Sequence, residues 1–396
     1  MWEEAQERGF SVDENIIVCK NCFEDYAIKE FIKNNDTGQS CNYCGTNKVG
    51  SCSLEIVLEH IMYCIHTEWG HPANEGLPYE TREGGWQGAV YDSWEMFDSI
   101  GLEINSDKLQ DDIMSSLMDN EWCERNPYSL SEDKTLFYGW RDFSRFVTTE
   151  ARYVFLKATP STYDEHQHDE MHPVQILEAL SNITKKLNLI RPIKKETPIY
   201  RVRIIDISTT LSSAAELGSP PLQHANVPNR MSPAGIPMFY GAFDSQTAIL
   251  ETYDSSISSG KKAAVARFLP TRDLAVLDLS KPLFVPSIFD SDAHTIRPWI
   301  KFIIEFMRDF TKPISRDDRS HIEYVPTQVV TEYFRHIVRT DDDLKLDGIV
   351  YPSSKANGEP AVVLFANSAQ CVDKATSYSG EAILFLDNVE EIHLPK

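Results

Sequence analysis

Residues 229–251 read NRMSPAGIPMFYGAFDSQTAILE and join a loop, a strand-length apolar run and the start of a helix. In "MFYGAF", alternation of period two places Tyr240 on one face of a strand and its neighbours on the other. Asp244 or Ser245 can then cap the helix that carries Glu251. The loop before the strand holds turn residues that let the backbone approach a ligand, namely Pro233, Gly235 and Pro237. This stretch predicts a loop–strand–helix unit of a fold that mixes α and β elements.

Three side chains of this unit suit a nucleotide ligand. Arg230 offers a fork of donors for a phosphate, Tyr240 offers a face on which a flat ring can stack, and Glu251 can stabilise positive charge on a sugar. A nucleotide whose N-glycosidic bond is broken would use all three. The alternative is structural, with Arg230 paired to a carboxylate, Tyr240 in the core and Glu251 solvated. On spacing alone this structural alternative is the better supported.

The sequence after residue 188 mixes strand-like runs and helices without a regular order. The strand-like runs are "IYRVRII", "IPMFYGAF", "AAVARFL", "LAVLDLS", "LDGIVYPS", "AVVLFAN" and "EAILFLD". Helical spacing interrupts them in "SQTAILETYD", "IRPWIKFIIEFMRDF" and "TQVVTEYFRHIV". This mixture predicts an α+β domain over residues 188–396.

Four cysteines near the start of the chain have the spacing of a zinc site. They stand in "CKNC" and "CNYCG" and are Cys19, Cys22, Cys41 and Cys44. Each pair forms a tight turn that aims two thiolates at one tetrahedral ion. Four sulfur ligands leave no position for water, so we expect a structural zinc within a ribbon over residues 1–50. Two disulfides are the alternative, which an intracellular setting disfavours.

Residues 51–187 show helical spacing. In "SLEIVLEHIMYCIHTEW" the apolar residues recur at intervals of three and four, and similar patterns follow in "DKLQDDIMSSLMD" and "HPVQILEALSNITKKLNL". Few strand-like runs interrupt them. We therefore expect an all-helical domain between the ribbon and the α+β domain.

Composition narrows the class of protein. The chain has 396 residues, of which 42% are hydrophobic and 25% charged, which is typical of a soluble protein with two or three domains. No apolar run approaches the roughly 18 residues of a membrane span, and "MWEEAQERGF" does not resemble a signal peptide, so we expect a cytoplasmic protein. The net charge of −22 makes a general affinity for nucleic acid unfavourable.

Several motifs occur in the order found in the RES domain family, named for its Arg, Glu and Ser. Besides the stretch at 229–251 they are "YRVR", "YVPTQVVTEYFR" and "DGIVYPSSKANGEPAVVLF". The resemblance covers about half the chain. It implies a fold similar to that of ADP-ribosyltransferase toxins and an activity that consumes NAD. It also implies Arg230, Tyr240 and Glu251 as site residues, with Ser353 as the family serine and Ser354 beside it as the other candidate.

The chemistry of NAD cleavage suggests a role for each of these residues. Glu251 would stabilise the sugar cation that forms when the bond to nicotinamide breaks. Arg230, with Arg201 of "YRVR", would hold the pyrophosphate. Tyr240 would stack on nicotinamide, and Ser353 would position the nicotinamide or its ribose. The long interval between Glu251 and Ser353 leaves room for an extra segment around "FVPSIFDSDAHTIRP".

The N-terminal half resembles the zinc-ribbon and HEPN-like extension that precedes some RES domains. HEPN ribonucleases use an Arg and a His a few residues apart, and residues 51–187 contain no such pair. The predicted function is an NAD glycohydrolase or a phosphorolytic NAD-degrading toxin. The alternatives are an ADP-ribosyltransferase acting on a macromolecule and a zinc-ribbon or HEPN-type interaction or RNA-processing protein whose C-terminal domain is idle. The expected partners are an antitoxin or a regulatory protein, and the chain can form oligomers.

Overall fold

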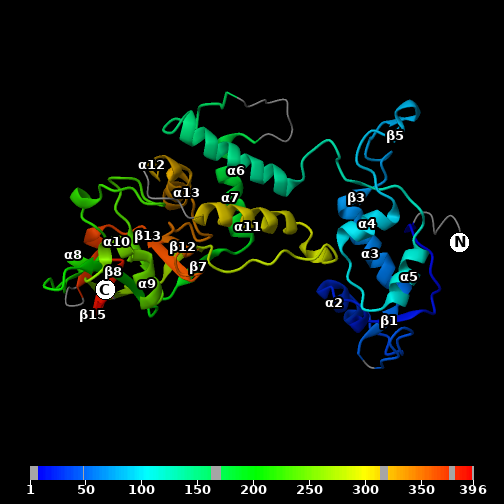
Figure 1. The fold of residues 1–396 in the computed structure, drawn as a ribbon, viewed down its shortest axis with the longest axis horizontal. Helices are drawn as coiled ribbons and strands as arrows, with labels where there is room; N and C mark the ends of the chain where they lie inside the picture. The colour runs from blue at the N-terminus through cyan, green and yellow to red at the C-terminus, as the bar shows by residue number, and fades with distance from the viewer. Residues whose placement is uncertain (1–7, 48, 162–170, 313–319, 374–379, 395–396) are drawn as a thin grey trace. The chain divides into compact units, whose positions relative to one another are not determined.

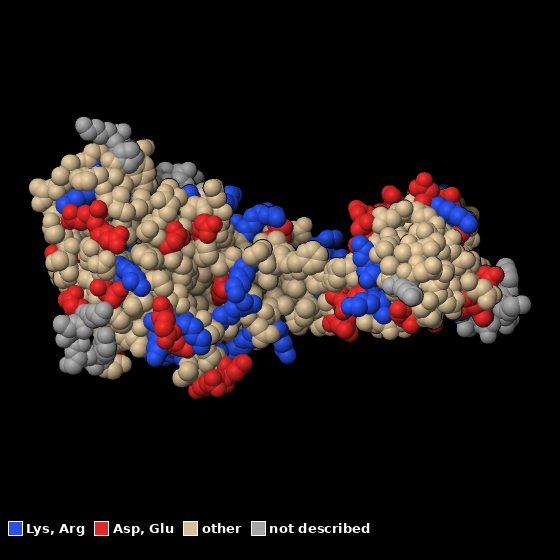
Figure 2. Space-filling view, turned by 90° about the horizontal axis from the view of Figure 1, so that it is seen from below, with Lys and Arg blue, Asp and Glu red and all other residues tan. Residues whose placement is uncertain are grey.

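The computed structural model describes residues 8–47, 49–161, 171–312, 320–373 and 380–394, and its contacts divide the chain into two compact units. The first comprises Met1–Glu132 with Phe284–Lys301, and the second comprises Asp133–Leu283 with Phe302–Lys396. Among the described helices none is long and apolar enough to cross a membrane. On the face drawn in Figure 2, Lys and Arg are interspersed with Asp and Glu.

The first unit is mostly helical. Strand β1 (Ile17–Cys19) pairs antiparallel with β2 (Ser51–Ser53). Its main helices are α2 (Tyr26–Asn34), α3 (Leu54–Glu68), α4 (Ser93–Ile100) and α5 (Asp107–Ser116). Its remaining elements are η1 (Lys20–Cys22), η2 (Thr81–Glu83), η4 (Ser291–Ala293), β3 (Trp69–Gly70), β4 (Tyr79–Glu80), β5 (Gly85–Trp86) and β6 (Cys123–Glu124).

Local chemistry explains where these helices begin. The side chain of Asp25 accepts from the N–H groups of Ala27 and Ile28 and caps α2, and Ser53 caps α3 in the same way. The apolar positions of α3 recur at helical spacing and are buried against α2. The helical character predicted for the start of residues 51–187 is therefore present in the first unit.

The extra segment expected around "FVPSIFDSDAHTIRP" belongs to the first unit although it interrupts the second in sequence. Ile288 and Phe289 are buried in the same core as α2 and α3. The Phe289 carbonyl lies 2.9 Å from Nε2 of His60, and the Tyr26 hydroxyl donates to Asp290 at 2.8 Å. This segment therefore completes the core of the first unit.

The second unit is built on a sheet of nine strands in the described residues, which confirms the prediction of a mixed α and β fold (Figure 1). The order is β14-β15-β10-β8-β9-β13-β12-β11-β7. Only β11–β12 and β14–β15 are parallel among these pairs. The strands are β7 (Ile190–Ile193), β8 (Ile199–Ile205), β9 (Phe239–Ala242), β10 (Lys262–Pro270), β11 (Leu274–Asp278), β12 (Gly348–Pro352), β13 (Pro360–Leu364), β14 (Cys371–Asp373) and β15 (Leu384–His393).

Helices surround this sheet. The longer ones are α6 (Glu132–Thr149), α7 (Pro173–Lys186), α9 (Ser245–Thr252), α11 (Arg297–Thr311) and α13 (Val325–His336). The short ones are α8 (Ala214–Leu217), η3 (Leu222–His224), α10 (Ser255–Ser258), α12 (Ser320–Glu323) and η5 (Ser368–Gln370). Helices α6 and α7 group with the sheet, although their pattern groups them with residues 51–187. The domain boundaries 1–50, 51–187 and 188–396 stay a prediction.

Strands β8 and β9 separate soon after they meet. Their ladder contains one pair, Tyr200 with Ala242, whereas β8 pairs with β10 over seven residues from Ile199 to Ile205. Helix α9 packs on the sheet here and buries Ala248 beside Val202 and Ala242. The separation leaves backbone and side chains of two adjacent strands facing an opening in the sheet.

Candidate functional site

A cavity of about 510 Å³ lies where β8 and β9 separate, a volume within the range usual for small-molecule sites. Strands, the loop before β9, α9 and the end of α11 all contribute to its wall. The lining residues are Tyr200, Arg201, Val202, Asn229, Arg230, Met231, Tyr240, Gly241, Ala248, Glu251, Thr252, Thr311, Tyr324, Tyr351, Pro352, Ser354 and Lys355. Of the predicted site residues in this domain, Arg201, Arg230, Tyr240 and Glu251 line the cavity and Ser353 does not.

Arg201 is a half-buried cation without a carboxylate partner among the described residues. Its Nη1 donates to the carbonyl of Tyr240 at 2.7 Å, and its guanidinium lies over the Phe239 ring at 5.3 Å. Its Nε is buried and has no hydrogen-bond partner. Burial, reinforced by the charge of Arg203, lowers the pKa of Arg201 to about 10. An uncompensated buried charge of this kind is costly, so an anion in the cavity would stabilise it.

Arg230 is held by backbone carbonyls. Nη1 donates to the carbonyl of Phe310 at 3.0 Å and Nη2 donates to that of Lys312, so the guanidinium caps the end of α11. Burial lowers the pKa of Arg230, while the nearby Tyr324, Tyr351 and Glu251 oppose that shift. The ion pair of the structural alternative is not found for Arg230 in the described part of the chain.

Two tyrosines share one face of the sheet. Tyr240 of β9 pairs with Val363 and Tyr351 of β12 pairs with Ala361, and these two partners lie two residues apart on β13. The Tyr240 hydroxyl lies 2.9 Å from Oγ of Ser232. Burial raises the pKa of Tyr240 to about 12. Burial and the neighbouring Glu251 raise the pKa of Tyr351 well above its usual range, so both phenols keep their protons at neutral pH.

Glu251 stands in the last turn of α9, as the sequence predicts. Asp244 begins this helix by accepting from the N–H of Thr247 at 2.8 Å. The Glu251 side chain is half-buried and lines the cavity. Its carboxylate has no hydrogen-bond or ion-pair partner among the described residues, while its carbonyl accepts from Nζ of Lys355 at 2.8 Å. The carboxylate is therefore free to contact a ligand.

Ser353 and Ser354 differ in position. Ser353 is 1% exposed, and its Oγ accepts from the N–H groups of Lys355 and Ala356 at 3.2 and 3.0 Å. Ser354, the other candidate in "YPSS", lines the cavity. Ser353 thus shapes the turn that presents Ser354 and Lys355.

Sequence reasoning missed Tyr324, Tyr351 and Lys355 as lining residues. Both tyrosines occur within quoted motifs, Tyr324 as the first residue of one and Tyr351 inside another, but their meeting at one cavity depends on which strands and helices pack together. Lys355 follows the family serine in a loop with no local pattern. Pairing of β13 with both β12 and β9 places Tyr351 and Tyr240 on one face of the sheet with β13 between their strands, and the pairing with β9 is the non-local one.

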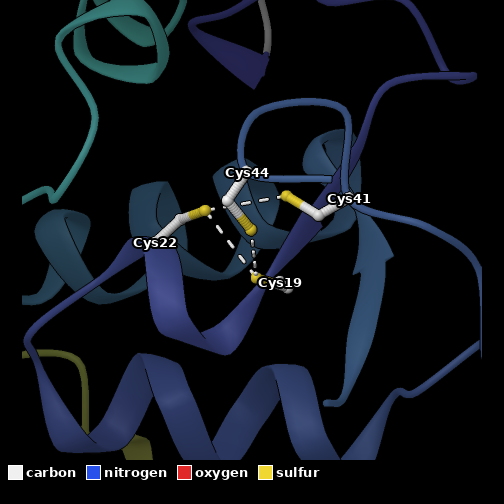
Figure 3. A group of neighbouring side chains, drawn as sticks. All are labelled: Cys19, Cys22, Cys41 and Cys44. Carbon is white, nitrogen blue, oxygen red and sulfur yellow. Dashed lines mark hydrogen bonds between the residues drawn. The ribbon is translucent and has the colours of Figure 1, made fainter. Parts of the chain in front are cut away.

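The four predicted cysteines form a separate cluster in the first unit (Figure 3). The Sγ of Cys19 lies 3.7 Å from that of Cys22 and 3.4 Å from that of Cys44, and Cys22 lies 3.6 Å from Cys41. A tetrahedron with metal–sulfur bonds of about 2.3 Å has edges of about 3.8 Å. All four cysteines are free of disulfides. The cluster is a set of thiols that can hold a metal ion.

Comparison with known families separates the two halves of the chain. A family model described as RES domain matches residues 199–385, which include every residue that lines the cavity. A second model, described as HEPN/RES N-terminal domain 1, matches residues 34–161. Neither the curated proteins nor the solved structures contain a match to the chain. The two family matches confirm the resemblance expected from the motifs.

Proposed function

Because the chain carries a RES domain preceded by a HEPN/RES N-terminal domain, we propose that it cleaves the bond between nicotinamide and ribose in NAD. The main support for this proposal is the arrangement of charged side chains in the cavity. The unpaired carboxylate of Glu251 lines the same cavity as Arg201 and Arg230, neither of which has a carboxylate partner in the described residues. This arrangement suits a ligand with a negative pyrophosphate at one end and a developing positive charge at the other.

The proposed reaction develops positive charge on the ribose, which a carboxylate can stabilise. Nicotinamide leaves as a neutral base and takes the electron pair of the N-glycosidic bond, so positive charge develops on the ribose. The Glu251 carboxylate stabilises that charge more strongly in the transition state than in the ground state. An oxygen of the acceptor then bonds to the anomeric carbon and loses a proton to solvent. With water the product is ADP-ribose, and with inorganic phosphate it is the phosphate ester.

The remaining side chains of the site would bind NAD and orient it. Arg201 is the stronger candidate for the pyrophosphate, since its Nε has no partner. Both terminal nitrogens of Arg230 already donate to carbonyls, so it would contribute charge and its remaining Nε–H unless it exchanges those contacts. Tyr240 offers its ring to nicotinamide, and Tyr351 and Ser354 offer hydroxyl donors. The family serine Ser353 would act by holding the turn around Ser354.

The fold of the RES domain, in this proposal, is similar to that of ADP-ribosyltransferase toxins. Its support is the separation of β8 and β9 with a cavity between them. We also propose that the chain acts as a toxin that depletes NAD and is restrained by an antitoxin or regulatory partner.

The cysteine cluster would hold a structural zinc ion. The support is the donor set of four thiols within 4.8 Å of one another, with three of the four cysteines buried. Four sulfur ligands complete a tetrahedral shell, so the ion would stabilise the ribbon and take no part in the reaction.

Incubation of the purified full chain with NAD, with the products resolved by mass, tests the proposed function. We expect release of nicotinamide together with ADP-ribose or its phosphate ester. Mass added to a protein or nucleic acid would instead support the transferase alternative. Intact NAD in the presence of phosphate and candidate acceptors would refute the proposed cleavage.

A further inference from the structure

Helix α13 buries an unusual set of polar side chains. Thr327, Gln328 and Thr331 are 5%, 7% and 0% exposed. A buried hydroxyl or amide costs free energy unless it is hydrogen-bonded, and glutamine is rarely buried. Three such residues within five positions therefore need partners.

Two of them find their partners in the loop that carries Arg230. Oγ1 of Thr327 lies within donating distance of two carbonyls, at 2.5 Å from that of Arg230 and at 2.9 Å from that of Tyr324, and the shorter contact is to Arg230. Nε2 of Gln328 donates to the carbonyls of Asn229 and Ser232 at 2.8 and 3.3 Å. Among the described residues no backbone N–H donates to the Arg230 carbonyl. The loop thus relies on α13 for contacts that regular secondary structure would otherwise supply.

This loop sets the position of two groups at the cavity. Asn229, Arg230 and Met231 all line it. Ser232 closes the loop through a bridge with Asn229 and lies within hydrogen-bond distance of the Tyr240 hydroxyl. Neither Thr327 nor Gln328 lines the cavity. A shift of the loop would move both the Arg230 guanidinium and the partner of the Tyr240 phenol.

We propose that Thr327 and Gln328 are positioning residues, which fix residues 229–232 and thereby hold Arg230 and Tyr240 in place opposite Glu251. The predicted effect on NAD turnover rests on the proposed function. The predicted effect on the order of residues 229–232 does not, because α13 holds this loop whatever reaction the site performs.

The test uses replacements that keep shape and remove the donor. Gln328→Met keeps the length of the side chain, and Thr327→Val keeps its branching. The matched control is Thr331→Val, since Thr331 is buried in the same helix and its Oγ1 donates within that helix, to the Thr327 carbonyl at 2.7 Å. Each variant is measured as the full chain for NAD turnover and thermal melting.

We expect kcat/KM for NAD to fall about tenfold or more in Thr327→Val and Gln328→Met, because carbonyls of the loop lose the side-chain donors that hold the loop against α13. Thr331→Val should stay within about twofold of wild type at a similar melting temperature. Thr327→Ser, which restores the hydroxyl, should recover the activity. A loss of activity in Thr331→Val equal to that in Gln328→Met would reduce Gln328 to a structural role and overturn the proposal.

Two further measurements separate positioning from general damage. In a background of Arg230→Lys, Gln328→Met should cost much less than in wild type, because both changes act through one group. Full additivity would contradict this coupling. Amide hydrogen exchange of residues 229–232 should accelerate in Gln328→Met and not in Thr331→Val, whether or not NAD is the substrate. Absence of NAD turnover by wild type would refute the proposed function, whereas unchanged exchange would refute the positioning role.

Discussion

Carbonyl dipoles stabilise two arginines of the candidate site, and neither arginine has a carboxylate partner among the residues that the structure describes. The guanidinium of Arg230 donates to the carbonyls of Phe310 and Lys312. That of Arg201 donates to the carbonyl of Tyr240. Carbonyl dipoles stabilise a cation without cancelling its charge. Both arginines therefore keep a positive potential available to an anionic ligand.

Arg230→Lys should weaken NAD binding about tenfold, because an ammonium is a point charge without the guanidinium fork. Lysine cannot reach both carbonyls at the end of α11 and a ligand together. Titration calorimetry with NAD checks this, with Arg203→Lys as control because Arg203 is half-buried on the same sheet and does not line the cavity. Equal affinities for wild type and Arg230→Lys would remove Arg230 from the binding site.

The sequence predicted those site residues that lie close together along the chain and missed those that are brought together by the pairing of distant strands. Arg230, Tyr240 and Glu251 lie within one loop–strand–helix unit, so alternation and helix capping were enough to bring them together. Tyr351 reaches the site through two strand pairings, and no local pattern encodes those. The burial of Ser353 and exposure of Ser354 to the cavity depend on a turn whose hydrogen bonds run from Lys355 and Ala356.

Among the individual elements, the spacing of the cysteines was enough to predict the cluster of four thiols, because each CxxC is a local turn. Strands with a clear alternating pattern, such as β8 and β10, were also predicted. The short strands β7 and β14 were not, since three or four residues carry too little periodicity. Their strand conformation is stabilised by neighbours at the two edges of the sheet.

Cys22→Ser should remove the metal and loosen the ribbon. Folding of a small four-thiolate site draws much of its free energy from the ion, so removal costs several kcal/mol locally. We expect about one zinc per chain in wild type by metal analysis and a lower first melting transition in the variant.

The control for the ribbon is Cys52→Ala, because Cys52 is buried in β2 and lies outside the cluster. Retention of zinc by Cys22→Ser would exclude it as a ligand. Loss of zinc in Cys52→Ala to the same degree would show that damage to the ribbon, and not loss of a ligand, releases the ion.

Over the whole chain, the order of segments in the sequence differs from their grouping into the two compact units. Residues 284–301 belong to the first unit, and α6 and α7 belong to the second. A change of pattern along the sequence predicts neither exchange, because both depend on contacts between distant segments.

A chain beginning at residue 188 should therefore be much less stable than one beginning at residue 133. The shorter chain lacks α6, which contains Trp140. The Trp140 ring lies 4.9 Å from the Phe306 ring, and Nε1 of Trp140 donates to Asp309 at 2.7 Å. Loss of one such buried aromatic costs about 3–5 kcal/mol. Both chains lack residues 1–132 and keep residues 284–301 of the first unit, so their comparison isolates α6 and α7. Equal melting temperatures by circular dichroism would contradict this packing.

The proposed cleavage of NAD in the cavity between β8 and β9 depends on Glu251, and a matched pair of glutamate variants tests this dependence. NAD turnover is measured for wild type, Glu251→Gln and Glu332→Gln, the last being a half-buried helical glutamate that does not line the cavity. We predict that Glu251→Gln lowers kcat by about a hundredfold or more at an unchanged melting temperature, because a neutral amide cannot stabilise the sugar cation. Glu332→Gln should match wild type. Wild-type turnover by Glu251→Gln would contradict the assignment of this cavity as the active site.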